Sequence, residues 1–394
     1  MIPSAHVSNR SQCMKVLHVC VCGPFTDGLA YQENELIEQH MVSGHAVTVI
    51  AATETYGPDK HVVHANPGVS MLRCGATLIR LPYVEIIPRA ICSKLRAHGG
   101  LWTVLRNIRP DRILFHGLTA WDLLVVAEYA RRTPGVKLFA DCHEDFNNSA
   151  RTWASRELLH KCFYRPIFRR CVDSIVEVLC VTPESLDFAI DFYGSPPAKT
   201  SLYPLGCAIE APGMVSQRRA EFRAQRGFSE SDIVITQTGK LDHTKKLAAA
   251  LRAFRSNPTP ALKFIIAGRM SDEVMTECLP LMQGDERISD LGWQSSDELR
   301  NVLAGADCFL QPFGQTVTTQ MAMGYGCVVL AQDLPSHRWL VGDNGCLFKD
   351  ASELDNVLQW VVCNQRRLAH LKKATAQFAA DKLDYRKLAL KIVA

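Results

Sequence analysis

Short apolar runs of β-type residues alternate with helical stretches along the chain, and this alternation constrains the fold more than any other feature. The pattern begins with a strand-like run at Val16–Cys22 and a glycine-containing loop. A helix follows over about Gln32–Ser43, and a second strand over His45–Ala51. Strand, helix and strand in this order predict a βαβ unit, in which the two strands lie parallel in one sheet.

The alternation continues in two successive series, and 394 residues are too many for one ordinary core. A Pro- and Gly-containing stretch, LGCAIEAPGM, separates the series. We therefore predict an α/β fold of two Rossmann-like, doubly wound parallel-sheet domains that face a central cleft. The predicted limits are a disordered leader over 1–13, an N-terminal domain over 14–210 and a C-terminal domain over 211–377. The further strands are expected at Arg112–Phe115, Lys137–Ala140, Ile175–Val181, Leu202–Pro204, Ile233–Thr236, Phe264–Ala267, Ile288–Leu291, Asp307–Gln311 and Val328–Ala331.

The composition excludes several classes of protein. With 47% hydrophobic and 21% charged residues, the chain has the composition of a globular protein, and its net charge of +4 is too small to indicate nucleic-acid binding. The 15 cysteines contain no C-x-x-C pair, which argues against zinc and favours a reduced, cytoplasmic protein. No apolar stretch approaches the length of a membrane span, and the N-terminus lacks the apolar core of a signal peptide.

The stretch IVITQTGKLDHTKKLAAA, residues 233–250, places cations where a buried strand ends and a helix starts near Lys246. Gly239 permits close approach of a ligand to the backbone, and the helix N-terminus presents unpaired N–H groups. Lys240 and Lys245 add positive charge at the same place. A diphosphate fits this arrangement; the alternative is a solvated loop with ordinary surface lysines.

This stretch resembles the phosphate-binding segment of retaining GT-B glycosyltransferases of family 4, also called glycosyltransferase group 1. Lys240 takes the position of the family's arginine, Lys245 that of its lysine, and Lys246 replaces the usual glycine. Five other segments resemble family motifs in the same order: Asp27–Ala51, Asp111–Gly117, Ile265–Arg269, Ser289–Trp293 and Asp343–Phe348. The resemblance also implies that the C-terminal helix, residues 378–394, crosses back to the N-terminal domain.

The resemblance implies a donor site in the second half, but one family feature is missing. The family carries two glutamates eight positions apart, whereas no acidic residue lies between Asp307 and Asp333 here. Neutral side chains are the nearest replacements for the two glutamates, which contact the sugar and the ribose in the family. The alternative is that residues 316–326 form only a turn and a helix start, with no role in ligand binding. The implied donor-binding residues are Gly239, Lys240, Lys245, Gly268, Arg269, Leu291, Gln315, Thr316, Thr319 and Gln320.

In the first half, His116 and His143 follow predicted strands, where a ligand of a parallel sheet binds. With Glu144 they are the candidate catalytic residues, Glu144 or Asp145 being able to orient or deprotonate an acceptor hydroxyl. Structural histidines and favourable helix-start carboxylates are the alternatives. We expect no metal, because the chain lacks Asp-x-Asp and this cluster is too local to converge on one ion. The glycine loop, with Gly23, Asp27 and Gly28, is expected to approach the acceptor or a phosphate.

Two stretches, 86–110 and 160–170, combine basic and aromatic residues. Basic, aromatic, amphipathic helices lie on anionic membranes. The alternative is that these two stretches form helices that pack on the sheet and expose their arginines to water. If the acceptor is lipid-linked, these stretches are where the protein would meet it, at the inner face of the membrane.

The resemblance implies transfer of a sugar from a nucleotide-diphosphate sugar to a hydroxyl of a glycan or lipid-linked acceptor. It further implies retention of configuration and no cofactor besides the donor. Two other functions stay open: a nucleotide-sugar epimerase of the same architecture, and a catalytically silent nucleotide-binding or scaffold protein, which the missing glutamates suggest.

Overall fold

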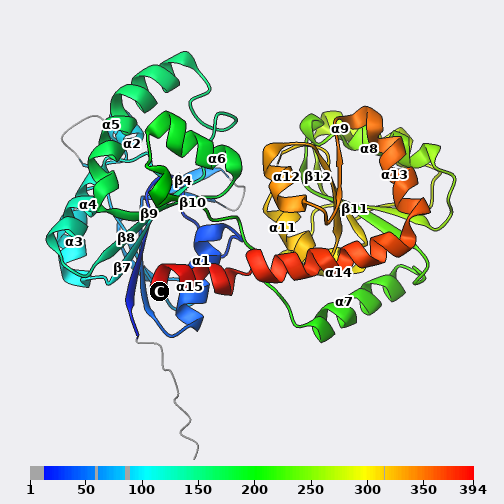
Figure 1. Cartoon of the computed structure of the whole chain (residues 1–394), viewed down its shortest axis with the longest axis horizontal. Helices are drawn as coiled ribbons and strands as arrows, with labels where there is room; N and C mark the ends of the chain where they lie inside the picture. Colours follow the sequence, from blue (N-terminus) through cyan, green and yellow to red (C-terminus); the bar gives the residue numbers. More distant parts are fainter. Residues whose placement is uncertain (1–12, 58–60, 85–88, 315) are drawn as a thin grey trace, which may run out of the picture. The chain divides into compact units, whose positions relative to one another are not determined.

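The computed structural model describes residues 13–57, 61–84, 89–314 and 316–394, so Gln315 and nearly all of the predicted leader lie outside it. The chain forms two compact units (Figure 1). The first contains the residues up to Tyr203 together with Leu388–Ala394, and the second contains Pro204–Lys387.

The first unit is built on an eight-stranded sheet with the order β10-β9-β8-β7-β1-β2-β6-β5. All neighbours in it are parallel except β5 and β6, and β3 and β4 form a separate antiparallel pair. The strands are β1 Lys15–Cys20, β2 Ala46–Ala51, β3 Glu54–Tyr56, β4 Val62–His64, β5 Gly68–Met71, β6 Thr77–Arg80, β7 Arg112–His116, β8 Lys137–Cys142, β9 Ile175–Cys180 and β10 Thr200–Leu202. The helices are α1 Gln32–Val42, α2 Arg89–Leu95, α3 Leu101–Ile108, α4 Asp122–Arg132, α5 Arg165–Cys171 and α6 Pro183–Asp187, with π-helical segments Ser155–Tyr164 and Phe188–Tyr193.

The central strands of this sheet, β1, β7 and β8, are buried on both faces, which explains why they are nearly continuous apolar runs. On β1, Leu17 and Val19 belong to the apolar cluster that includes residues of α3, α4 and α5. Val16 and Cys20 point the other way, into a cluster with Ile37 of α1 and Val393 near the C-terminus. His18 lies between Val16 and Cys20 in this alternation and therefore faces α1.

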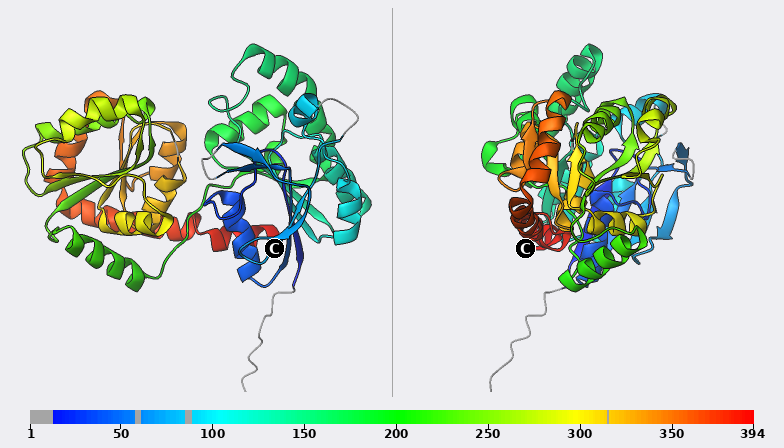
Figure 2. Two further views of the ribbon diagram at one scale, coloured as in Figure 1. Left: turned by 180° about the vertical axis from the view of Figure 1, so that it is seen from behind. Right: turned by 90° about the vertical axis from the view of Figure 1, so that its right-hand side faces the viewer.

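The second unit is built on a six-stranded parallel sheet with the order β13-β12-β11-β14-β15-β16. Apolar clusters on both sides of this sheet show that helices cover both faces, as Figure 2 also shows. The strands are β11 Ile233–Leu241, β12 Leu262–Met270, β13 Ile288–Asp290, β14 Cys308–Gln311, β15 Val328–Gln332 and β16 Cys346–Phe348. The helices are α7 Pro212–Gln225, α8 Leu247–Ser256, α9 Asp272–Met282, α10 Ser296–Gly305, α11 Val317–Gly324, α12 Pro335–Val341, α13 Leu354–Cys363 and α14 Gln365–Lys382.

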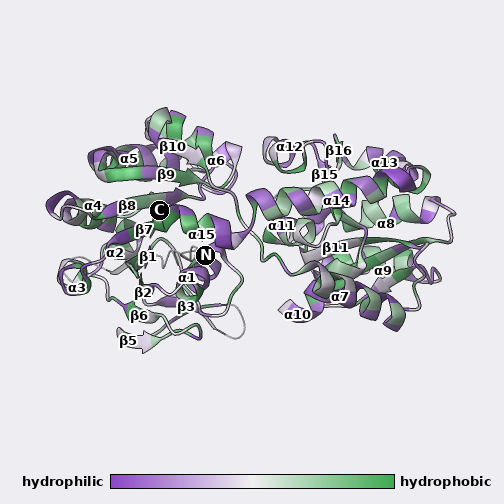
Figure 3. Ribbon diagram, turned by 60° about the horizontal axis from the view of Figure 1, so that its bottom comes forward, coloured by the Kyte–Doolittle hydropathy of each residue, from purple (hydrophilic) through white to green (hydrophobic). Residues whose placement is uncertain are grey.

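The last helix is α15, Tyr385–Val393. The helix before it, α14, carries both hydrophilic and hydrophobic residues along its length (Figure 3). Within the first unit, α15 is held by a hydrogen bond from the Tyr203 hydroxyl to the Leu388 carbonyl, at 2.8 Å. An ion pair of 2.7 Å between Lys391 and Glu177 adds to it. In the described part of the chain, no helix has the length and apolar character needed to cross a bilayer.

The predicted α/β fold with two parallel-sheet units is confirmed. Each predicted strand is present within a few residues, and β11 and β12 extend to nine residues each. Five strands that the structure describes were not expected from the sequence, namely β3, β4, β5, β6 and β16.

Candidate active site

The carboxyl ends of β1, β7 and β8 surround a cavity of about 390 Å³ in the first unit, which we call the carboxyl-end cavity. Its lining includes four of the predicted residues, namely Gly23, His116, His143 and Glu144. The parallel register of β7 and β8 sets His116 beside Asp141. The structure therefore brings the predicted catalytic residues together at one end of this sheet.

Asp141 is the centre of this cluster. Its carboxylate accepts hydrogen bonds from the Gly117 amide at 2.8 Å and from Nδ1 of His116 at 2.6 Å. Nε2 of His143 lies 3.4 Å from the same carboxylate. Burial opposes the charge of Asp141, but the attraction of His116 and His143 outweighs it and lowers the pKa of the carboxyl far below its usual range. Asp141 is thus a buried, ionised carboxylate.

The two histidines differ in their access to the cavity. The side chain of His116 is 9% exposed, whereas that of His143 is 38% exposed. Partial burial disfavours the charge of His143, but the Asp141 carboxylate outweighs this effect and raises the pKa of His143 to about 9. His143 therefore presents a protonated ring to the cavity at neutral pH and can donate a hydrogen bond or a proton there.

Glu144 lines the same cavity and accepts a hydrogen bond of 2.9 Å from the Thr119 hydroxyl. Its neighbour Asp145 uses Oδ1 to accept the backbone amides of Asn147 and Asn148, which is a local turn. Of the two carboxylates considered from the sequence, Glu144 is thus the one that lines the cavity.

Asp27 and Gly28 do not line the carboxyl-end cavity. Asp27 accepts the backbone amide of Arg73 at 3.0 Å. Gly28 has φ +77°, and a Cβ atom there would lie 2.7 Å from the Arg73 guanidinium. The structure thus pairs this part of the glycine loop with Arg73, and Gly23 alone of the three predicted loop residues lies at the cavity.

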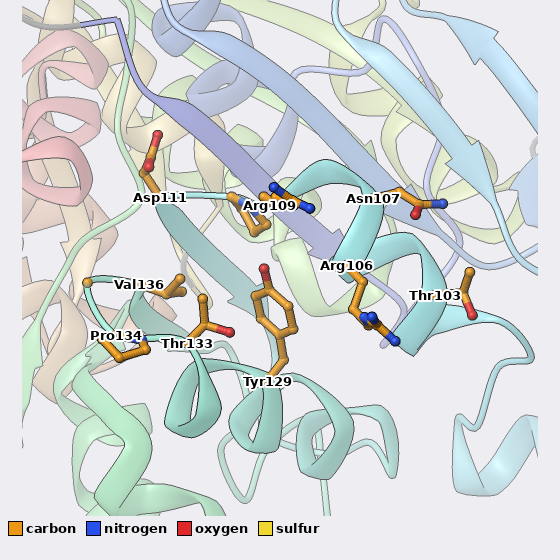
Figure 4. A pocket seen from close by; sticks show the side chains of 11 residues that line it. Thr103, Arg106, Asn107, Arg109, Asp111, Tyr129, Thr133, Pro134 and Val136 are labelled. Atoms are coloured by element: carbon orange, nitrogen blue, oxygen red, sulfur yellow. The ribbon is translucent and has the colours of Figure 1, made fainter.

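A larger cavity, of about 750 Å³, lies at the other end of the strands, where β7 and β8 begin (Figure 4). Exposed residues of the first basic stretch, Arg106 and Arg109, line it together with Tyr129. By contrast, Arg96 of the same stretch is half-buried and donates to the Thr119 carbonyl at 2.8 Å. The basic residues of 86–110 that the structure describes therefore do not form one exposed face.

The second unit gathers the predicted donor residues at the carboxyl ends of its parallel strands. Gly239 and Lys240 end β11, and their register partners Gly268 and Arg269 end β12. Leu291 follows β13, and Thr316 precedes α11, after β14. Because these strands are parallel neighbours in the sheet, their carboxyl ends lie side by side along one edge, which we call the donor edge of the sheet.

The backbone conformation at the donor edge explains the residue type at two positions, 268 and 246. A Cβ atom on Gly268 would lie 2.0 Å from the carbonyl oxygen of Gly239, so only glycine permits the close approach of these two strands. Lys246, which replaces the family's glycine, has φ +52°, a left-handed conformation that glycine adopts most readily. The segment between β11 and α8 therefore keeps a glycine-like turn.

The cations of the donor edge form no ion pair with a carboxylate of the described residues, although the charge of Asp242 acts on Lys245. In the described residues, Lys240, Lys245 and Arg269 form no ion pair, and Lys240 and Arg269 are exposed. Nζ of Lys245 lies 3.4 Å from the Phe313 carbonyl, after β14, and burial lowers the pKa of Lys245. Positive charge that is not held in ion pairs, at adjacent strand ends and in the turn after β11, is suited to an anionic ligand.

The predicted residues of α11 are placed differently. Thr316 is half-buried, but Thr319 and Gln320 are fully buried. Neither polar atom of the Gln320 amide has a hydrogen-bond partner, and the Gln237 Oε1 and Thr238 Oγ1 atoms of β11 lack one too. Gln320 therefore has no surface through which it meets a ribose in this arrangement, and Gln315 lies outside the described residues.

Sequence reasoning missed three residues of the first unit that contact the predicted ones. His18 and His40 are fully buried and form a hydrogen-bonded chain with His116, and Thr119 holds Glu144. His18 carried one usable signal, because a histidine inside the buried run VLHVCVC needs a polar partner.

Comparisons with known proteins agree with this geometry. Residues 27–206 match the family model described as a glycosyl transferase 4-like domain, and residues 232–364 match the model described as glycosyl transferases group 1. A search of curated protein sequences finds no match.

Solved structures of GT-B glycosyltransferases share the fold at low identity. Sucrose-phosphate synthase from Thermosynechococcus elongatus is 14% identical with a TM-score of 0.65, over 96% of this chain and 97% of that one. Anabaena Alr3699/HepE in complex with UDP and glucose is 16% identical with a TM-score of 0.62, over 96% and 98%. WaaG, a glycosyltransferase involved in lipopolysaccharide biosynthesis, is 15% identical with a TM-score of 0.61, over 96% and 98%. The chain is therefore a glycosyltransferase, and it belongs to the GT-B enzymes that join a glycosyl transferase 4-like domain to a glycosyl transferases group 1 domain.

Proposed function

We propose that the protein transfers a sugar from a nucleoside-diphosphate sugar to a hydroxyl group of a glycan or lipid-linked acceptor. Configuration at the anomeric carbon is retained, and no metal ion is required. The observation that carries this proposal is the set of cations at the ends of β11 and β12, and in the turn after β11, that form no ion pair in the described residues. The HepE structure with UDP and glucose, and starch synthase IV from Arabidopsis thaliana with ADP and acarbose, support a nucleotide donor.

In this proposal Lys240 and Lys245 bind the diphosphate. Charge grows on the diphosphate as the bond to the sugar breaks, so the two ammonium groups stabilise the transition state more than the ground state. A lysine in place of arginine keeps the charge but loses the bidentate contact.

The carboxyl-end cavity supplies the groups that act on hydroxyls. His143 is protonated and open to the cavity, which suits it to donate a hydrogen bond to a sugar hydroxyl. Glu144 is held by Thr119 and is suited to accept a hydrogen bond from the acceptor hydroxyl.

The test is to incubate the purified protein with a panel of nucleoside-diphosphate sugars, with and without acceptor glycans, and to measure the released nucleoside diphosphate and the product. Acceptor-dependent release with a new glycosidic bond of the donor's configuration is expected. A sugar epimerised without any acceptor would identify an epimerase instead. Tight nucleotide binding with no turnover across the panel would identify a silent binding protein.

A further inference from the structure

Three buried histidines of the first unit form a continuous hydrogen-bonded chain that starts at Asp141. Nε2 of His116 lies 3.0 Å from Nδ1 of His18, and Nε2 of His18 lies 3.0 Å from Nδ1 of His40. Nε2 of His40 lies 3.0 Å from the carbonyl oxygen of Ala389, on α15. The chain therefore joins β8, β7, β1, α1 and the C-terminal helix.

The two ends of this chain determine how many protons it holds. The Asp141 carboxylate and the Ala389 carbonyl only accept hydrogen bonds, so the ring at each end must donate. Four hydrogen bonds then need four ring protons, but three neutral imidazoles carry three. One of the three histidines is therefore an imidazolium.

The extra proton belongs to His116, because this ring touches the carboxylate. At His18 and His40, burial lowers the pKa, and the other histidines of the chain add to this effect. His116 instead has its Nδ1 2.6 Å from Asp141, whose second oxygen is held by the Gly117 amide. A charge beside a carboxylate costs less than a charge buried without one.

We infer that His18 and His40 are positioning residues that hold His116 as an imidazolium whose two N–H groups are both used inside the protein. His116 is then a fixed positive charge beside the carboxyl-end cavity and neither gives nor takes a proton. His143, the exposed ring, is left as the histidine that meets the substrate. This role in catalysis rests on the proposed function, whereas the protonation states do not.

Other titratable groups near His116 keep the local charge nearly balanced. Burial raises the pKa of the Cys20 thiol, at the end of β1, and of the Cys22 thiol, just after β1, well above the usual value, so both stay neutral. Carboxylates on α1 and after β8 offset the positive charge of His143. These surrounding groups are Cys20, Cys22, Glu33, Arg96, Asp141, His143 and Glu144.

The direct test is nitrogen NMR of the full-length protein labelled with ¹⁵N-histidine, near neutral pH, with rings assigned by single substitutions. Two protonated ring nitrogens are expected on His116, and one protonated nitrogen is expected on each of His18 and His40. A singly protonated His116 with the second proton on His18 or His40 would overturn the inference. This measurement needs no turnover, so its result is independent of the proposed function.

A substitution at the far end of the chain gives a second test. His40→Phe removes the need for a fourth proton, so His18 can donate to His116 and His116 becomes neutral. Loss of that charge near His143 should move the alkaline limb of the pH–rate profile up by roughly one pH unit. His45→Asn is the control, because His45 lies beside His40 but bonds the Met14 amide instead. The contrary outcome is a His40→Phe variant that is slower and yet keeps a doubly protonated His116 and an unchanged alkaline limb of the pH–rate profile. That result would show that His40 has a purely structural role.

Discussion

At the scale of single residues, buried polar side chains decide how this protein responds to pH. His40 has no exposed surface and a pKa lowered to about 4, chiefly by burial. The unfolded chain binds a proton there below its ordinary value of 6.5, and the folded chain does not until about 4. The free energy of unfolding should therefore fall as pH drops from 6.5 towards 4, by roughly 3 kcal/mol from His40 alone.

Urea unfolding at several pH values checks this prediction. The double variant His18→Phe/His40→Phe lacks both buried neutral rings and should be less sensitive to acid in this window than the unsubstituted protein. His370→Asn, a substitution of an exposed histidine on α14, should not change the pH dependence. An equal acid sensitivity of all three proteins would contradict the assignment of buried neutral rings at positions 18 and 40.

His143 predicts a loss of stability at alkaline pH, opposite to the acid effect of His40. Its pKa is raised to about 9 by Asp141, which outweighs the effect of burial, so the folded protein holds a proton that the unfolded chain releases above 6.5. The stability from this ion pair is fully present below pH 6.5 and is lost as pH rises through 9. His143→Gln should flatten the alkaline limb of stability; a limb that persists in this variant would assign it to another group.

At the scale of elements, the end of β11 and the turn into α8 are set by backbone constraints. Gly268→Ala would place a Cβ atom 2.0 Å from the Gly239 carbonyl and should lower the free energy of unfolding by about 1 to 3 kcal/mol. Gly213→Ala is the matched control, because Gly213 lies in α7 with no atom within 4 Å of its Cβ position. Equal stability of both variants in urea titrations would show that the two strands separate at no cost.

The left-handed Lys246 gives a second element-scale prediction. Because Lys246 has φ +52°, glycine fits the folded conformation at this position, but it also gains conformational freedom in the unfolded chain. These effects oppose each other, so Lys246→Gly should leave the free energy of unfolding within about 1 kcal/mol of the unsubstituted protein. Lys246→Val should cost about 1 to 2 kcal/mol, because a β-branched residue is strained there. Lys240→Val, at an extended position of β11, should show no such cost.

Elements and site were predictable from the sequence to different degrees. Alternation identified the strands of both parallel sheets, because strands buried on both faces are short continuous apolar runs. The exposed strands β4 and β5 lack such runs, since none of their residues is buried. Histidines at strand ends marked the carboxyl-end cavity, but the chain through His18 and His40 joins positions far apart in sequence. Spacing alone gives no sign of such contacts.

At the scale of the whole molecule, the last residues belong to the first unit, although they follow the second in sequence. Deleting Leu388–Ala394 removes the acceptors of the Tyr203 hydroxyl and of His40, and the partner of Glu177. The melting temperature of the first unit should fall by on the order of 10 °C, while that of the second unit should not change. Temperature-dependent hydrogen exchange, followed separately for peptides of each unit, measures both values. Equal losses in the two units would contradict this division.

Cations at the end of β11 and in the turn that follows it are proposed to bind the diphosphate of a nucleotide. Calorimetric titration of UDP, or of whichever nucleoside diphosphate binds best, into Lys245→Ala tests this proposal most directly. Lys263→Ala is the control, because Lys263 lies in β12 and pairs with Asp232. We predict a loss of affinity of about tenfold or more for Lys245→Ala, equivalent to 1.4 kcal/mol or more, and no change for Lys263→Ala. Unchanged affinity in Lys245→Ala would show that this cation does not bind the diphosphate.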